Sequence, residues 1–130
     1  MIAVVKEVHF ERKANGRKRL ANGPGFLMPP RTPRISKLMA LAIRFQSLLR
    51  DGTVWDQSDL ARLTHVTQPR MTQILNLLHL APDIQEELLF LPPVEGRDRI
   101  HERMLRPMTG MLVWKEQRSA WRRIHAQRCR

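Results

Sequence analysis

The stretch DQSDLARLTHVTQPRMTQILNLLHL, residues 56–80, predicts two short helices joined by a tight turn. Asp56 can cap the first helix, and the hydroxyl of Thr67 can accept from the free N–H groups of the second. Pro69 falls in the first turn of that second helix, where its missing N–H costs nothing. We therefore expect a second helix over 67–79.

The apolar residues of this stretch recur at spacings that pack two helices across each other at a steep angle. The small Ala61 lies where the second helix must cross the first closely, and Val66 is the single apolar residue of the turn. The expected apolar wedge consists of Ala61, Val66, Met71 and Ile74. The expected stripes of the two helices are Leu60, Ala61 and Leu63 on the first, and Met71, Ile74, Leu75 and Leu78 on the second.

The opposite face of the second helix is polar, with side chains that can donate to and accept from base edges and phosphates. The predicted DNA-contacting residues of this helix are Thr67, Gln68, Pro69, Arg70, Thr72, Gln73 and Asn76. The pattern is typical of a helix-turn-helix, with residues 67–79 as the recognition helix that enters the major groove.

The segment LARLTHVTQPRMTQILNLLHLAPDIQEELLF, residues 60–90, resembles the helix-turn-helix of ParB-type partition proteins and related plasmid and phage DNA-binding proteins. The likeness follows the pattern L-A-x-L-x-x-V-[ST]-x-x-x-[MVI]-[ST]-x-x-[LI] and covers roughly residues 38–91. His65 stands in the turn where the family usually has glycine, a position that commonly needs a positive φ. The resemblance implies a DNA-binding protein of a plasmid, phage or other mobile element, active in transcription regulation, recombination or partition.

The net charge of +11 is distributed unevenly along the 130 residues. Residues 1–34 carry eight Lys/Arg and two Asp/Glu, a net charge of +6. Residues 35–96 carry five Lys/Arg and seven Asp/Glu, a net charge of −2. Residues 97–130 carry ten Lys/Arg and three Asp/Glu, a net charge of +7. Affinity for a polyanion should therefore come from the flanks and selectivity from the middle; the alternative is that the flank charge serves only solubility. The predicted phosphate-binding cations are Arg12, Lys13, Arg17, Lys18, Arg19, Arg31, Arg34, Arg118, Arg122 and Arg123.

The same three ranges predict the organisation of one mostly α-helical domain, a helix-turn-helix bundle of about five to six helices. We expect residues 1–34 to form a basic arm and a Pro/Gly-rich linker, residues 35–96 the helix-turn-helix core, and residues 97–130 a basic helical segment. The arm alternates weakly and contains the type I′ turn signal Asn15-Gly16, so it is either a short β-hairpin or a basic arm that orders on DNA.

Further helices should surround the central pair. Residues 35–50 have a continuous apolar stripe and should support its back, and a helix after Pro82 should pack behind the DNA-binding face because its outer side is acidic. In the C-terminal segment, Pro107 and Gly110 should kink or divide an apolar stripe that includes Leu112. Its tryptophans could belong to the core, to a dimer contact or to a docking surface for another protein.

Enzyme chemistry is not expected. The five histidines show no i, i+4 pair, there is no glycine-rich phosphate loop, and the lone Cys129 excludes a cysteine-rich zinc site, so we expect no metal and no cofactor. The chain has no apolar run of membrane-spanning length and no signal peptide, so a cytoplasmic, nucleoid-associated protein is expected.

The expected partner is double-stranded DNA, bound by a homodimer. Two alternatives stay open: an accessory factor that binds DNA and docks a recombinase or a partition protein through the C-terminal helix, and, less favoured, an RNA-binding repressor.

Overall fold

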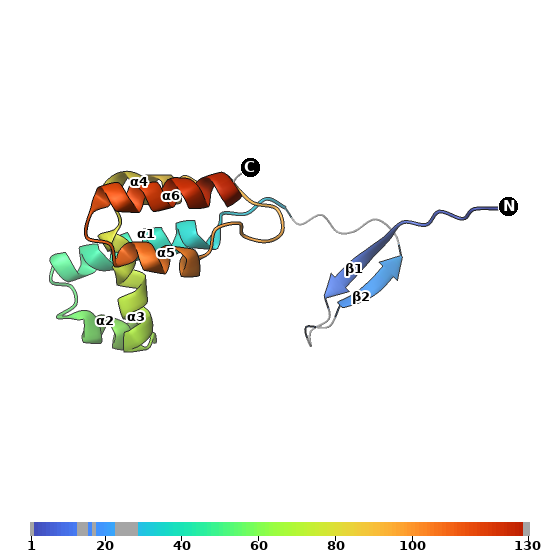
Figure 1. Ribbon diagram of the computed structural model, residues 1–130. Helices are drawn as coiled ribbons and strands as arrows, with labels where there is room; N and C mark the ends of the chain where they lie inside the picture. Colours follow the sequence, from blue (N-terminus) through green and yellow to red (C-terminus); the bar gives the residue numbers. More distant parts are fainter. Residues whose placement is uncertain (1, 13–15, 17, 23–28, 129–130) are drawn as a thin grey trace.

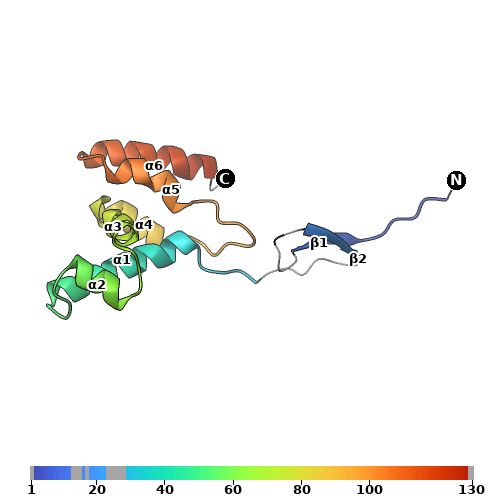
Figure 2. The same ribbon diagram turned by 90° about the horizontal axis from the view of Figure 1, so that it is seen from below.

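The computed structural model describes residues 2–12, 16, 18–22 and 29–128, and it confirms a mostly helical protein with a short N-terminal β-hairpin (Figure 1). The elements are β1 (Val8–Arg12), β2 (Lys18–Asn22), α1 (Arg34–Arg50), α2 (Gln57–Leu63), α3 (Gln68–Leu75), the 3-10 helix η1 (Asn76–His79), α4 (Pro82–Leu89), α5 (Glu102–Thr109) and α6 (Trp114–Arg128). Figures 1 and 2 show the hairpin apart from the helices, which form one body.

One hydrophobic core holds the helical body together. Its fully buried side chains come from α1, α2, α3, η1, α4, α5 and α6, from Ile35 at one end of the chain to Trp121 at the other. Residues 97–128 therefore share the core of residues 35–96. α1 is central to it, because it packs against α2, α3 and α4. The hydroxyl of the buried Ser36 donates to the carbonyl of Leu88 at 2.6 Å and ties α1 to α4.

The turn between α2 and α3 has the predicted caps. Asp56 accepts from the Asp59 N–H at 2.8 Å at the start of α2. At its end the Val66 N–H donates to the Ala61 carbonyl at 3.0 Å and the His65 N–H to the Arg62 carbonyl at 3.4 Å. This is a Schellman motif, and it requires a left-handed residue at its centre. His65 has φ +55°, as expected for a residue at the family's glycine position.

Replacing His65 by glycine is expected to raise the free energy of unfolding by about 0.5–1 kcal/mol, because a β-carbon is unfavourable in the left-handed region. The gain is reduced by the larger backbone entropy that glycine loses on folding. Urea denaturation followed by circular dichroism measures it. Arg62→Gly, inside α2, serves as the control and should be destabilising; a destabilised His65→Gly variant would contradict the turn geometry.

Three apolar positions differ from the sequence prediction. Leu63 is 54% exposed, because α2 ends there and the chain turns away from the core. Leu77 is fully buried whereas Leu78 is only half-buried, since α3 continues as the tighter 3-10 helix η1 and places the residue three after Ile74 on the inner side. Leu112 is 96% exposed, because Gly110 ends α5 and Leu112 lies in the turn before α6.

Pro107 does not divide the C-terminal segment. It lies inside α5, and the division comes at Gly110, which caps the C-terminus of that helix.

The acidic residues Asp83, Glu86 and Glu87 of α4 are exposed, as expected, and Asp83 and Glu87 also contact α6. The Arg118 guanidinium donates to the Asp83 carboxylate at 2.9 and 3.2 Å, and the Trp121 indole N–H donates to Glu87 Oε2 at 2.7 Å. The hydrogen bond from Arg118 lowers the pKa of Asp83, and the same bond raises the pKa of Arg118. Trp121 is therefore a core residue, whereas Trp114 remains half exposed.

Residues 29–33, directly before α1, are described, and Arg31 among them contacts the loop between α4 and α5. Arg31 forms an antiparallel β-bridge with Val94, with N–O distances of 3.0 and 2.9 Å. Its guanidinium donates to Asp98 Oδ1 at 3.0 Å and to the Gly96 carbonyl at 2.8 Å. These bonds anchor the start of α1 to the loop between α4 and α5.

In the N-terminal hairpin, the strands pair Arg12 with Lys18, which leaves five residues between them. The predicted type I′ turn at Asn15-Gly16 cannot be assessed, because Asn15 lies outside the described residues.

Candidate nucleic-acid interface

The inner face of α3 is fixed against the core. Met71 and Ile74 are buried against neighbouring helices, including α1. At the N-terminus, Thr67 accepts from the Arg70 N–H at 3.4 Å, and Pro69 lies in the first turn, as predicted. A helix held in this way presents its other face with little freedom to rotate.

Two glutamine side chains hold the far end of α3 and η1. Gln85 of α4 donates from Nε2 to the carbonyls of Leu78 and Leu80, at 3.1 and 2.8 Å. Gln117 of α6 is 0% exposed. It accepts from the Ala81 N–H at 2.8 Å and donates to the carbonyls of His79 and Met111, both at 3.0 Å.

Gln117 was missed by the sequence prediction. The signal available for it is a polar residue at position i−4 from Trp121, on the otherwise apolar side of α6.

The outer face of α3 carries the predicted polar residues, and α2 steadies one edge of it. Thr67, Gln68, Pro69 and Thr72 are exposed, while Gln73 and Asn76 are partly buried. Gln57 Nε2 donates to Thr72 Oγ1 at 2.8 Å, and Gln68 Nε2 donates to Ser58 Oγ at 3.1 Å.

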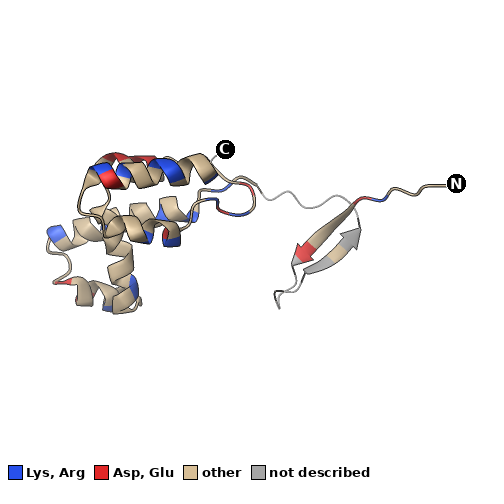
Figure 3. Ribbon diagram, in the orientation of Figure 1, with Lys and Arg blue, Asp and Glu red and all other residues tan. Residues whose placement is uncertain are grey.

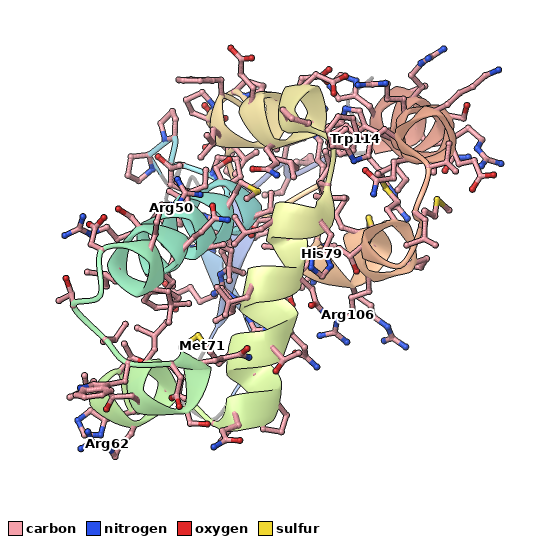
Figure 4. All side chains as sticks on the ribbon, turned by 90° about the vertical axis from the view of Figure 1, so that its left-hand side faces the viewer. Arg50, Arg62, Met71, His79, Arg106 and Trp114 are labelled. Carbon is pink, nitrogen blue, oxygen red and sulfur yellow. The ribbon has the colours of Figure 1, made fainter. Side chains whose placement is uncertain are left out.

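α5 borders the other edge of the same face, and Figure 4 shows α2 and α5 on opposite sides of α3. Arg70 Nη1 donates to both carboxylate oxygens of Glu102, at 2.8 and 2.7 Å. Gln73 Oε1 accepts from Arg70 at 3.2 Å and from Arg106 of α5 at 3.4 Å. Arg70 is thus held in an ion pair with α5 and positions Gln73.

Arg106 of α5 therefore joins the site, although the sequence prediction did not include it. Arg106, labelled in Figure 4 beside α3, has half of its side chain exposed, and Arg103 is exposed one turn earlier. Their i, i+3 spacing in a predicted helix is the signal that could have identified them. Together, α3 and α5 place polar side chains next to cations, a combination that can contact base edges and phosphates.

The predicted basic flanks are not gathered around this face in the described part of the chain. α6 lies at the end of the helical body opposite α2 in Figures 1 and 2, and Figure 3 shows its basic residues next to the acidic ones of α4. Arg122 and Arg123 are exposed there, but Arg118 is paired with Asp83 and lies 5.9 Å from the ring centre of Trp114.

The N-terminal cations also lie away from α3. Arg34 is the first residue of α1, which has 17 residues and is about 25 Å long. Arg34 therefore lies far from the C-terminal end of α1, which leads to α2. Arg31 is paired with Asp98. Arg12, Lys18 and Arg19 belong to the strands of the hairpin, while Lys13 and Arg17 fall outside the described residues.

No protein-family model, curated protein or solved structure matches the chain. The resemblance to ParB-type proteins therefore stays a prediction from the sequence.

Within the described residues, no three His, Cys, Asp or Glu side chains are grouped as a metal site would need. Over the same residues, no helix is long and apolar enough to cross a membrane.

Proposed function

We propose that this protein binds double-stranded DNA sequence-selectively, with α2 and α3 acting as a helix-turn-helix and α3 entering the major groove. The observation that carries the proposal is the contrast between the two faces of α3. Its inner face is buried and its ends are tied by caps and glutamines, while its outer face is polar and largely exposed. A fixed polar helix of this kind suits direct readout of base edges.

Gln73 and Asn76 are the base-reading residues in this proposal. The Oε1 atom of Gln73 accepts from two guanidinium groups, which fixes the orientation of its amide, including the NH2 group. That NH2 group can donate to the major-groove acceptors of guanine, adenine or thymine. Arg70 then serves as a positioning residue, which is a narrower role than the base contact expected from the sequence.

Replacing Arg103 and Arg106 by alanine is expected to weaken binding to every duplex, since both can contact phosphates, and to weaken binding to the preferred duplex further, because Arg106 helps to orient Gln73. Loss of two such contacts should make the slope of log K against log salt less steep by about 1.8. Titrations at several salt concentrations measure this slope. Arg122→Ala/Arg123→Ala on α6 is the matched control. A larger change of slope in this control would show that the phosphate contacts are made by α6 instead.

A single helix of this kind reads only a few base pairs, so two copies should bind a pseudo-palindromic site with half-sites about 34 Å apart. A homodimer is therefore part of the proposal.

Direct titration tests the class of ligand. The protein should bind duplex DNA more tightly than a structured RNA of equal length at the same salt concentration, and DNA affinity should fall as salt rises. Tighter binding to RNA would favour the RNA-binding alternative, for which the exposed Trp55 offers a stacking surface.

A second candidate is an accessory factor that docks a recombinase or a partition protein on a mobile element. The turn before α6 favours it, because Leu112, Val113 and Trp114 form a run of exposed apolar side chains. Co-purification with such a protein encoded beside this chain, lost in a Leu112→Ser/Trp114→Ala variant that still binds DNA, would establish this role.

A further inference from the structure

The β1–β2 hairpin carries an apolar pair that nothing covers in the described structure. Phe10 lies opposite Leu20 in the register, and the two side chains are 73% and 59% exposed. Val8 continues the same face on one side, and the next pair on the other side, Arg12 and Lys18, is basic. An isolated two-stranded hairpin is marginally stable in water, so this ribbon needs a surface to pack against.

A groove at the C-terminal end of α4 has the complementary character. It has a volume of about 460 Å³ and is lined by residues that include Glu86, Glu87, Phe90, Pro92 and His125. Phe90 is 78% exposed. We call this hollow the α4 groove. It offers an apolar floor for an aromatic side chain, with carboxylates beside it.

The carboxylates of the α4 groove are unusual in a chain of net charge +11. Asp83, which also lines it, is neutralised by Arg118. Glu87 accepts from the neutral indole of Trp121. Neither Glu86 nor Glu87 forms an ion pair with any Lys or Arg of the described residues. Two acidic side chains therefore line the groove without a Lys or Arg partner among the described residues.

A second hollow connects the α4 groove to the origin of the hairpin arm. Its volume is about 630 Å³, it shares Leu91 and Pro92 with the α4 groove, and it extends to Pro30 and Pro33 just before α1. The arm thus leaves the helical body at the margin of the surface that is apolar and acidic.

We propose that the α4 groove binds the β1–β2 hairpin of a second copy of this chain, and that two copies exchange hairpins reciprocally. The pair Phe10–Leu20 packs on Phe90, and the net charge of +6 that the sequence of residues 1–34 carries is complementary to Glu86 and Glu87. The hairpin lies apart from the helical body, α4 included, in Figures 1 and 2, which favours a second copy as the occupant. The contact is isologous, so each copy supplies one hairpin and one groove and the assembly closes at two.

The exchange is compatible with DNA binding by both copies. The α4 groove lies at the end of the helical body where α6 ends, whereas α2 lies at the other end (Figure 1). Docked hairpins therefore leave the outer faces of both α3 helices open. The inference rests on the proposed function only in that this function needs two copies of the chain. The test of the inference contains no DNA, so the inference and the proposed function can fail separately.

Sedimentation velocity of the full chain over a range of concentrations tests the exchange. The wild type should be a dimer. Phe10→Ser, which removes the apolar anchor of the hairpin, and Glu86→Lys/Phe90→Ser, which alters the groove, should each raise the dimer dissociation constant about tenfold or more. The exposed Leu112→Ser and Glu116→Lys are matched controls and should leave it unchanged. Circular dichroism should show the helical body intact in every variant.

Mixing the two defective variants is the sharper measurement. The groove variant keeps an unaltered hairpin, and the hairpin variant keeps an unaltered groove. A heterodimer of the two therefore contains one intact contact, whereas either homodimer contains none. Heterodimers should form more readily than either homodimer. A monomeric wild type would overturn the proposal, including the case of a hairpin bound to its own groove. So would dimers unaffected by Phe10→Ser, dimers lost in Leu112→Ser, or a mixture that dimerises no better than its components.

Discussion

Replacing Gln117 by leucine is expected to lower the free energy of unfolding by about 3–5 kcal/mol. The side chain is completely buried, and it satisfies the Ala81 N–H and the carbonyls of His79 and Met111. Leucine fills a similar volume but leaves the buried Ala81 N–H and the part-buried carbonyls of His79 and Met111 without this partner. Each such group costs about 1–3 kcal/mol, and part of that cost is relieved when the α5–α6 turn shifts toward water.

Chemical denaturation in urea measures the loss, with Gln127→Leu on the exposed end of α6 as the matched control. Gln117→Glu provides a second comparison, because it keeps an acceptor for the Ala81 N–H but turns a carboxylate oxygen toward two carbonyls. It should be no more stable than Gln117→Leu. A Gln117→Leu variant as stable as the control would show that Gln117 does not hold the end of η1.

Replacing Gln73 and Asn76 by alanine is expected to cost about 2–6 kcal/mol of affinity for the preferred duplex, since each specific base contact is worth about 1–3 kcal/mol. The affinity for unrelated duplexes should stay the same, because phosphate contacts supply it. Fluorescence anisotropy on both duplexes at one salt concentration separates the two effects.

Gln46→Ala is the control for that pair, as it removes an exposed amide from α1 outside the proposed interface. Neither Gln73 nor Asn76 is fully buried, so the double variant should retain the stability of the wild type to within about 1 kcal/mol. An equal loss of affinity for both duplexes would assign these residues to backbone binding and remove them from base readout.

The central pair of helices could be predicted because its determinants are local. An N-cap acts on a backbone N–H three residues away, and a Schellman turn closes within six residues. Asp56, Thr67 and the left-handed His65 are therefore readable from a short stretch of sequence. The same holds for the helical stripe of α1, whose inner residues recur at helical spacing.

The sequence did not predict which charged side chains form ion pairs, because their partners are distant in sequence. Arg31 pairs with a residue 67 positions away, Arg70 with one 32 away, and Arg118 with one 35 away. Counting charges along the chain treats these three as available cations. Tertiary packing instead uses them to join α1, α3 and α6 to their neighbours, and it brings Arg106 to the edge of α3.

Selection from a pool of random duplexes, with the wild type and Gln73→Ala/Asn76→Ala in parallel, tests sequence-selective binding through α3 most directly. We predict that the wild type enriches a short motif repeated as a pseudo-palindrome, and that the double variant retains DNA without enriching that motif. The same motif enriched by both proteins, or no motif enriched by the wild type, would contradict the proposed role of α3.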